Sequence, residues 1–468
     1  MSHRVVDSLS PLAGSRLTRK RCSIGSWLLI AWSLGGCTEP STTPLNVVLI
    51  TLDTFRADAL GVYGNPEGLS PHIDAFASEA TIFENAVTAI GTTFPSHATI
   101  FTGLYPKNHG VRWNGDSLDR RWTTLAEILS AEGYETAAFV SVGSLLSRGG
   151  LDQGFSSFSD SREAPPAQHT RSGYAVNEMV LSWLAERSDV PFFLWLHYFE
   201  THTPYRLSPH ARKRHEDADY HGIFARGATA EMLHGLDPEF SWSPAEKSAL
   251  RALYDGAIIE VDRLVGEILG TLRARNLMET TAVFLTADHG ESLGEHNEVG
   301  HGFLLWQPVI HVPLIVRVPG ARPRRVATRV SLVDLSPTIL DLLGLAAPPE
   351  LDGRSLISGI VGEQLPPHRY FAEVRAIGSH SFRTVPNADR FAVFDGNLKA
   401  MWDSDHLLVL DLEHDPQELR PEDTRAAEGK RRELFRYLAT YREGAVEPAR
   451  QELTDAVKKE LQSLGYLP

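Results

Sequence analysis

Four continuous apolar runs are spaced along the chain, with helical stretches between them. The runs cover residues 46–52, 191–196, 281–287 and 312–318. Runs without alternating polar residues are typical of strands that are covered on both faces, as in a largely parallel sheet. The helical stretches cover residues 124–132, 175–186 and 245–273. This alternation predicts an α/β fold with a large mixed, mostly parallel sheet sandwiched by helices.

The pattern changes after residue 356. Short apolar runs at 370–374, 382–385, 390–394 and 407–412 are separated by turn residues such as Asp395-Gly396-Asn397. This spacing is typical of antiparallel strands. A charged helical stretch at 422–442 follows. We therefore predict a catalytic domain at 45–356 and a smaller C-terminal antiparallel α+β subdomain at 357–468.

The first residues are typical of a secretory signal. A basic cluster around Arg19-Lys20-Arg21 precedes an apolar run at 24–34 that is too short to span a bilayer. The following Leu34-Gly35-Gly36-Cys37 resembles the bacterial lipobox, which implies cleavage after residue 36 and lipid attachment at Cys37. Residues 1–36 are then a lipoprotein signal peptide and 37–44 a polar tether. The expected location is the bacterial cell envelope, on its periplasmic or outer-surface side, with membrane contact through the lipid. An uncleaved anchor and a secreted protein remain alternatives.

Charge and cysteine content narrow the function. The 468 residues include 45 Lys and Arg and 59 Asp and Glu, for a formal charge of −14. Such an acidic chain is unsuited to coating nucleic acid by bulk electrostatics, so we expect no nucleic-acid partner. The only two cysteines, Cys22 and Cys37, lie near the N-terminus. A cysteine nucleophile or Cys-based zinc site is therefore excluded from the body of the protein.

Metal-type side chains follow three of the apolar runs. Asp53 follows the first run, His197 and His202 follow the second, and Asp288-His289 follow the third. One Asp after a strand is more often a turn or helix-cap residue. Because functional groups gather at the carboxyl ends of strands in α/β folds, three such cases together predict one shared crevice.

Thr93 stands where a polar stretch becomes helical, in Thr92-Thr93-Phe94-Pro95-Ser96-His97. A helix N-terminus favours a phosphate or sulfate group. A threonine hydroxyl becomes a nucleophile only when a base or metal activates it. From these residues alone, a plain helix cap is the preferred interpretation of Thr93.

Several separate motifs, taken in order, resemble the sulfatase family of the alkaline phosphatase superfamily. They are Asp53-x-x-Arg56-x-Asp58, Thr93-x-Pro95-Ser96-His97, His202-x-Pro204-Tyr205, Asp288-His289-Gly290-Glu291 and Leu351-Asp352-Gly353-Arg354. The resemblance runs from about Asn46 to the C-terminus and implies the family's fold and its hydrolysis of sulfate or phosphate esters.

Three positions depart from the family pattern. Thr93 replaces the Cys or Ser that the family oxidises to formylglycine, and His97 replaces the Arg of the same motif. The stretch 139–144 lacks the family's Lys-x-His pair, and the family's Asp-Asp is Asp53-Thr54. The set therefore looks closer to the threonine branches of the superfamily, which act on phosphodiesters or transfer phospho groups.

The resemblance also implies roles for individual residues. Asp53, Thr93, Asp288 and His289 are the expected ligands of a divalent metal, with Thr93 as nucleophile. An imidazole with few carboxylates favours zinc or manganese over calcium. His202 and His301 are expected to bind substrate or protonate the leaving group, although they could hold a second metal. Arg56 and His97 are candidate contacts of the substrate anion, and for Arg56 a structural ion pair is an equal alternative.

We therefore expect a metal-dependent hydrolase of sulfate or phosphate esters. One alternative is a phosphodiesterase or phospho-group transferase acting on envelope lipids or glycans. The other is a catalytically inactive binding lipoprotein, which the absence of the Lys-x-His pair favours and the retained Asp53, Thr93, Asp288 and His289 oppose.

Overall fold

The structure is a computed structural model that describes residues 44–450, apart from 143–145, 147–148, 160–169, 238–239, 376–388, 404–405, 422–427 and 447–448. The described residues belong to one compact unit. The predicted signal peptide, Cys37, the tether up to residue 43 and the strand at 382–385 lie outside the described residues. The part of the chain that the structure describes contains no helix with both the length and the apolarity to cross a membrane.

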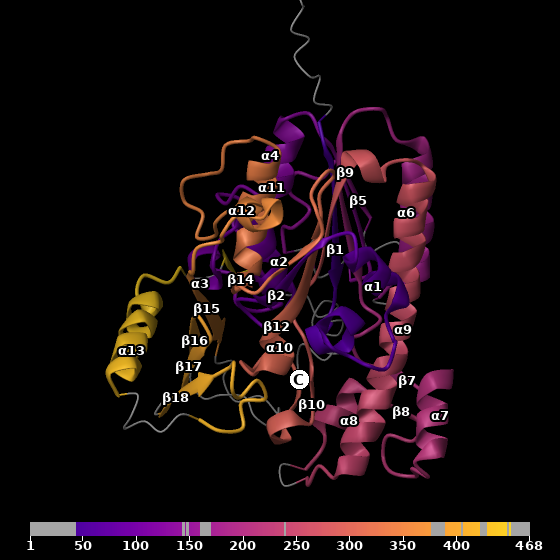
Figure 1. The fold of residues 1–468 in the computed structure, drawn as a ribbon, viewed down its shortest axis with the longest axis vertical. Helices are drawn as coiled ribbons and strands as arrows, with labels where there is room; N and C mark the ends of the chain where they lie inside the picture. Colours follow the sequence, from indigo (N-terminus) through magenta and orange to yellow (C-terminus); the bar gives the residue numbers. More distant parts are fainter. Residues whose placement is uncertain are drawn as a thin grey trace, which may run out of the picture. The chain divides into compact units, whose positions relative to one another are not determined.

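A nine-stranded mixed sheet lies at the centre of this unit (Figure 1). Its order is β13-β2-β12-β9-β1-β6-β4-β5, and β14 also pairs with β2. The strands are β1 (Asn46–Leu52), β2 (Thr81–Val87), β4 (Glu135–Val140), β5 (Ser157–Ser159), β6 (Phe192–Tyr198), β9 (Thr281–Ala287), β12 (His311–Arg317), β13 (Arg324–Val326) and β14 (Val330–Ser331). The strands from β9 to β5 are parallel, whereas β12 is antiparallel to both β2 and β9. The predicted mixed, mostly parallel sheet is confirmed.

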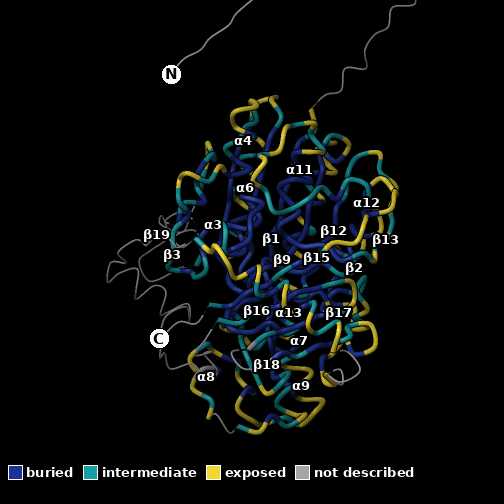
Figure 2. The backbone as a smooth tube through the Cα atoms, turned by 90° about the vertical axis from the view of Figure 1, so that its left-hand side faces the viewer, coloured by how far each residue is buried: buried dark blue, intermediate teal, exposed yellow. Residues whose placement is uncertain are grey.

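The apolar runs form the most deeply buried strands of this sheet (Figure 2). Every residue of β1, β6 and β9 is buried. In the register, Leu49 of β1 lies between Trp195 of β6 and Phe284 of β9. β2 and β4 were not predicted from the apolar pattern, because Glu84 interrupts β2 and β4 begins with the polar residues Glu135 and Thr136.

Helices cover both faces of the sheet, as predicted (Figure 1). One side carries α6 (Gly173–Glu186) and α9 (Pro244–Ala274), with α1 (Pro71–Ala77) packed on α9. The other side carries α2 (Thr93–Thr102), α4 (Leu125–Ala131) and α11 (Leu335–Leu342). Local sequence fixes where these helices begin: Thr124 and Glu127 form a capping box on α4, and the Ser243 side chain caps α9.

A separate four-stranded antiparallel sheet confirms the predicted C-terminal α+β part. It consists of β15 (Arg369–Val374), β16 (Arg390–Asp395), β17 (Leu398–Asp403) and β18 (His406–Asp411), and α13 (Glu428–Arg442) packs against it. The predicted turn joins β16 to β17 through Gly396, whose φ of 61° is left-handed. We missed β17 because Lys399 interrupts its apolar pattern.

Short elements complete the described chain. The first group lies beyond the carboxyl end of β1: β7 (Tyr205–Arg206), β8 (Gly227–Ala228), α7 (Pro209–Asp217), α8 (Ala230–His234), β10 (Ser292–Leu293) and β11 (Val299–Gly300) (Figure 1). The others are α3 (Pro106–His109), β3 (Asp116–Ser117), α10 (Gln307–Ile310), α12 (Ile357–Val361) and β19 (Ala449–Arg450).

Candidate active site

The structure brings four predicted residues together at the carboxyl ends of β1 and β9. Because these strands are parallel and Leu52 pairs with Ala287, Asp53 and Asp288 leave the sheet at the same level. Ligand atoms of Asp53, Asp288 and His289 all lie within 4.8 Å of one another. The Thr93 hydroxyl completes the group, with Oγ1 3.5 Å from Asp53 Oδ2 and 3.4 Å from His289 Nε2. All four side chains are fully buried.

Thr93 is not a helix cap. Thr92 occupies the N-cap of α2 with an extended φ of −143°, and Thr93 is the first helical residue. The start of α2 is held at two points: the Phe94 backbone N–H donates to Asn114 Oδ1 at 2.9 Å, and Ser96 Oγ donates to the Asp288 carbonyl at 2.7 Å. These bonds fix the hydroxyl of Thr93 toward the carboxylates. The sequence offered no signal for Asn114, which lies in a loop that follows no predicted strand.

The backbone around the carboxylates orients them. The N–H groups of Thr54 and His289 both donate to Asp288 Oδ1, at 3.2 and 2.7 Å. Thr54 adopts a left-handed φ of 51°, which is uncommon for a β-branched residue and allows its N–H to reach that oxygen. Asp288 Oδ2 is thereby left facing the other ligands.

The donor set fits a divalent cation. Within the described part of the chain, Asp53 Oδ1 and Asp288 Oδ2 are buried and make no hydrogen bond. Burial raises the pKa of both carboxyl groups, and the negative charge of Asp53 raises that of Asp288 further, so a positive charge between them would be stabilising. Burial and His301 hold the pKa of His289 well below its usual value, and neutral imidazole is the metal-binding form.

His202 and His301 border this group. The His301 ring centroid lies 4.6 Å from that of His289 and 4.9 Å from that of His202. The His202 ring stacks on Phe199 at 4.3 Å. His301 therefore packs against the candidate ligand His289, and His202 packs against His301, as the two ring distances show.

Glu291 connects two walls of the site and was missed as a functional residue. Its Oε1 lies 3.1 Å from His301 Nδ1, and its Oε2 accepts a hydrogen bond from Tyr205 Oη at 2.8 Å. Burial opposes a charge on His301, but the charge and hydrogen bond of Glu291, together with the charges of Asp53 and Asp288, outweigh burial and raise the pKa of His301. The motif Asp288-His289-Gly290-Glu291 held the signal for this residue, because it places the carboxylate two residues after a ligand.

His97 lies behind the site, not at a substrate position. Its side chain is fully buried, with Nδ1 2.8 Å from the Thr93 carbonyl and Nε2 3.0 Å from Thr51 Oγ1. With both ring nitrogens occupied by protein atoms, the predicted substrate contact does not fit this placement. His197 packs beside it with a ring centroid distance of 4.7 Å, and its Nε2 lies 3.3 Å from Asp53 Oδ2.

Arg56 is engaged by carboxylates. Its guanidinium makes two hydrogen bonds to Asp58, at 2.9 and 2.7 Å, and one to Glu295 at 2.7 Å. A fourth bond runs to the Glu291 carbonyl at 3.0 Å. Of the two roles expected for Arg56, the structure favours the structural ion pair over the substrate contact, because these carboxylates neutralise the charge of the guanidinium.

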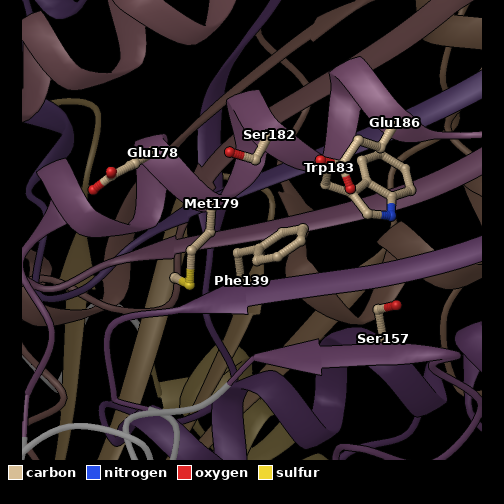
Figure 3. Close-up of a pocket in the computed structure, with 7 residues that line it drawn as sticks. All are labelled: Phe139, Ser157, Glu178, Met179, Ser182, Trp183 and Glu186. Carbon is tan, nitrogen blue, oxygen red and sulfur yellow. The ribbon is translucent and has the colours of Figure 1, made fainter.

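Two other cavities lie apart from Thr93 and the metal-type ligands. One pocket, with a volume of about 450 Å³, lies between α6 and the strands β4 and β5. Figure 3 shows its lining residues, among them Phe139, Met179 and Trp183. A second pocket, of about 640 Å³, is lined by Arg56, Arg251 and His311. Neither is lined by Thr93 or the metal-type ligands.

Comparisons with known proteins give a family match and several relatives. The sequence model of the family described as Sulfatase matches residues 45–345. The multifunctional alkaline phosphatase superfamily protein PehA of Trinickia caryophylli is 28% identical over 399 residues, covering 67% of this chain and 77% of that protein. Arylsulfatase K of Mus musculus is 27% identical over 353 residues, covering 67% of this chain, and this chain spans only 63% of its length.

A solved structure shares the fold. The crystal structure of the phosphonate monoester hydrolase of Agrobacterium radiobacter aligns with a TM-score of 0.68 and 24% sequence identity. The alignment covers 88% of this chain and 98% of that one.

Proposed function

The chain belongs to the sulfatase family, and on that premise we propose that it is a metal-dependent hydrolase of sulfate or phosphate esters in which Thr93 is the nucleophile. The relatives support the ester-hydrolase activity itself, since they are named as arylsulfatases and a phosphonate monoester hydrolase. Thr93, the metal ligands and the roles of the histidines are the parts that we add.

The position of the Thr93 hydroxyl is the observation that carries the proposal. The hydroxyl lies at the start of α2, within 3.5 Å of both Asp53 and His289, although the family's usual nucleophile is absent. Asp53 Oδ2 accepts its hydrogen bond and is the proposed acceptor of its proton. Oγ1 then forms a bond to sulfur or phosphorus, while the ester bond to the alcohol breaks. Attack by water in a second step releases Thr93 and the inorganic anion.

Asp53, Thr93, Asp288 and His289 would hold the cation. Once bound, a divalent metal lowers the pKa of a neighbouring hydroxyl and offsets negative charge on the ester oxygens. The mixed carboxylate and imidazole set favours zinc or manganese over calcium.

His301 is the proposed donor of the proton that the leaving alcohol needs. Its Nδ1 lies 3.1 Å from Glu291 Oε1, and this contact orients the ring. Its raised pKa keeps the ring protonated at higher pH than an ordinary histidine, as a general acid requires. His202, next to it, is proposed to contact the substrate.

The two alternative functions fit the site to different degrees. A phosphodiesterase or phospho-group transferase of envelope lipids or glycans fits the replacement of Cys or Ser by Thr93. An inactive binding lipoprotein fits less well, because the Asp53, Asp288 and His289 cluster is retained.

We also propose lipid attachment at Cys37. Intact-mass measurements of membrane fractions should detect the lipid on the wild type and not on a Cys37→Ser variant.

The test combines a substrate panel with variants of Thr93. Purified protein loaded with zinc or manganese is assayed on aryl sulfate, phosphate monoester, phosphodiester and phosphonate monoester. We expect turnover of at least one class, a loss of about 10⁴-fold or more in kcat for Thr93→Ala, and partial retention by Thr93→Ser, which keeps the hydroxyl. Undiminished turnover by Thr93→Ala would refute the nucleophile, and metal-loaded protein that is inert on every class would favour the binding role.

A further inference from the structure

The segment that carries His301 is held by the C-terminal sheet. We call residues 301–307 the His301 segment. Three alternate residues of this segment make backbone hydrogen bonds to side chains of that sheet and of the turn that follows it. The Phe303 carbonyl accepts from Arg390 Nη1 at 3.3 Å, the Leu305 carbonyl accepts from Lys399 Nζ, and the Gln307 N–H donates to Glu418 Oε2 at 2.7 Å.

The side chains of the segment point into the same region. Phe303 and Leu305 belong to the second hydrophobic core, together with Phe391 and Phe394 of β16 and Leu434 of α13. The packing of the C-terminal sheet therefore determines where the His301 segment lies. His301 itself, two residues before Phe303, is the point where this packing reaches the active site.

A buried ion pair is the centre of this connection. Lys399 and Glu418 have fully buried side chains, and Lys399 Nζ donates to Glu418 Oε1. Removing two charges from water is costly, and well-packed apolar residues often give equal or greater stability. Each member, however, also bonds the backbone of the His301 segment, which apolar side chains could not do. The arrangement fits a geometric role better than a stabilising one.

We propose that Lys399 and Glu418 are positioning residues that hold His301 in place for proton donation to the leaving group. The catalytic part of this inference rests on the proposed function. A displacement of about 1 Å at a reacting group can cost roughly 10²-fold in rate, so the loss of both backbone bonds should be measurable. The C-terminal sheet is then part of the catalytic machinery, although none of its residues touches the substrate.

The test uses Lys399→Met/Glu418→Met, in which both charges are replaced together so that neither is left buried alone. Hydrogen–deuterium exchange of the holoprotein should become at least about tenfold faster at the Gln307 amide, while peptides of β1 and β9 stay unchanged. Lys399→Met/Glu418→Gln restores an acceptor for the Gln307 N–H and should recover protection. Lys430→Met is the matched control, because it breaks an ion pair with Asp395 in the same sheet but makes no bond to the segment.

Kinetics then test whether the effect passes through His301. In the double variant, kcat/KM should fall by about 10–100-fold for esters of poorly acidic alcohols and much less for nitrophenyl esters, which need no proton. In a His301→Ala background the same two substitutions should cause no further loss. A loss of kcat/KM that is equal for all esters and persists in the His301→Ala background would overturn the inference. Unchanged hydrogen–deuterium exchange at the Gln307 amide would overturn it as well. A wild-type protein inert on all esters would refute the proposed function instead, and the exchange measurement would still decide whether the pair holds the segment.

Discussion

Oε1 of Glu291 lies 3.1 Å from Nδ1 of His301, and the two residues flank the β10–β11 hairpin. Glu291 is 1% exposed, so its charge acts on the imidazole with little screening by water. Tyr205 fixes the other carboxylate oxygen through its hydroxyl. A single carboxylate thus sets both the orientation and the charge of the proposed proton donor.

Replacing Glu291 with Gln should shift the alkaline limb of the kcat/KM profile to lower pH. In the wild type, the carboxylate raises the pKa of His301 against the opposing effect of burial. A general acid loses activity as pH rises through its pKa, so removing the charge should make that loss begin earlier. The measurement is the pH dependence of kcat/KM on a poor leaving group.

Tyr205→Phe is the control for this change. It removes a hydrogen bond to Glu291 but leaves the negative charge next to His301. Its profile should keep the alkaline limb of the wild type. An unchanged limb in Glu291→Gln would show that another group is the titrating acid.

Removing the metal should show how much the two buried carboxylates destabilise the folded protein. Chelation should abolish turnover and lower the Tm, and zinc or manganese should restore both better than calcium. Asp53→Asn should lose metal binding, yet its metal-free form should be roughly 1–3 kcal/mol more stable than metal-free wild type, because one of two neighbouring buried charges is gone. Thermal unfolding with and without metal measures this difference.

Asp334→Asn provides the contrast. Asp334 is equally buried, but its oxygens accept from the Ser331 and Arg354 N–H groups and from Tyr370 Oη, at 3.1, 2.9 and 2.7 Å. The same substitution should therefore destabilise the protein there. If Asp53→Asn also destabilises the metal-free form, the neighbouring carboxylates of Asp53 and Asp288 do not lower the stability of the protein as we infer.

The sequence predicted the part of the fold that depends on continuous apolar runs. β1, β6, β9 and β12 lie within about two residues of the expected ranges, because strands buried on both faces tolerate few polar residues. β2 and β17 were not predicted, because the polar residues inside these strands make hydrogen bonds or ion pairs with residues that are distant in the sequence. Lys399 is the clearest case, since its partner Glu418 comes from a later turn.

The same limit applies to the site. The order of the motifs was enough to place Asp53, Asp288 and His289 in one candidate site, because Asp53 and Asp288 directly follow strands and His289 comes next. It misplaced His97 and left Arg56 open, because the partners of these residues, Thr51 for one and Glu295 for the other, are distant in the sequence. Spacing identifies which residues leave the sheet at one edge, but not which side chains are already engaged there.

His97→Arg should destabilise the protein strongly. The family places an arginine at this position, so a substrate-contacting role would predict that the substitution preserves or improves substrate binding. In this chain the ring is fully buried, 5.1 Å from Trp195 and 4.7 Å from His197 by ring centroids. A longer side chain there would be overpacked, which costs about 1–3 kcal/mol. Denaturant unfolding gives the free energy, and a stable variant with a lower KM would instead restore His97 to the substrate site.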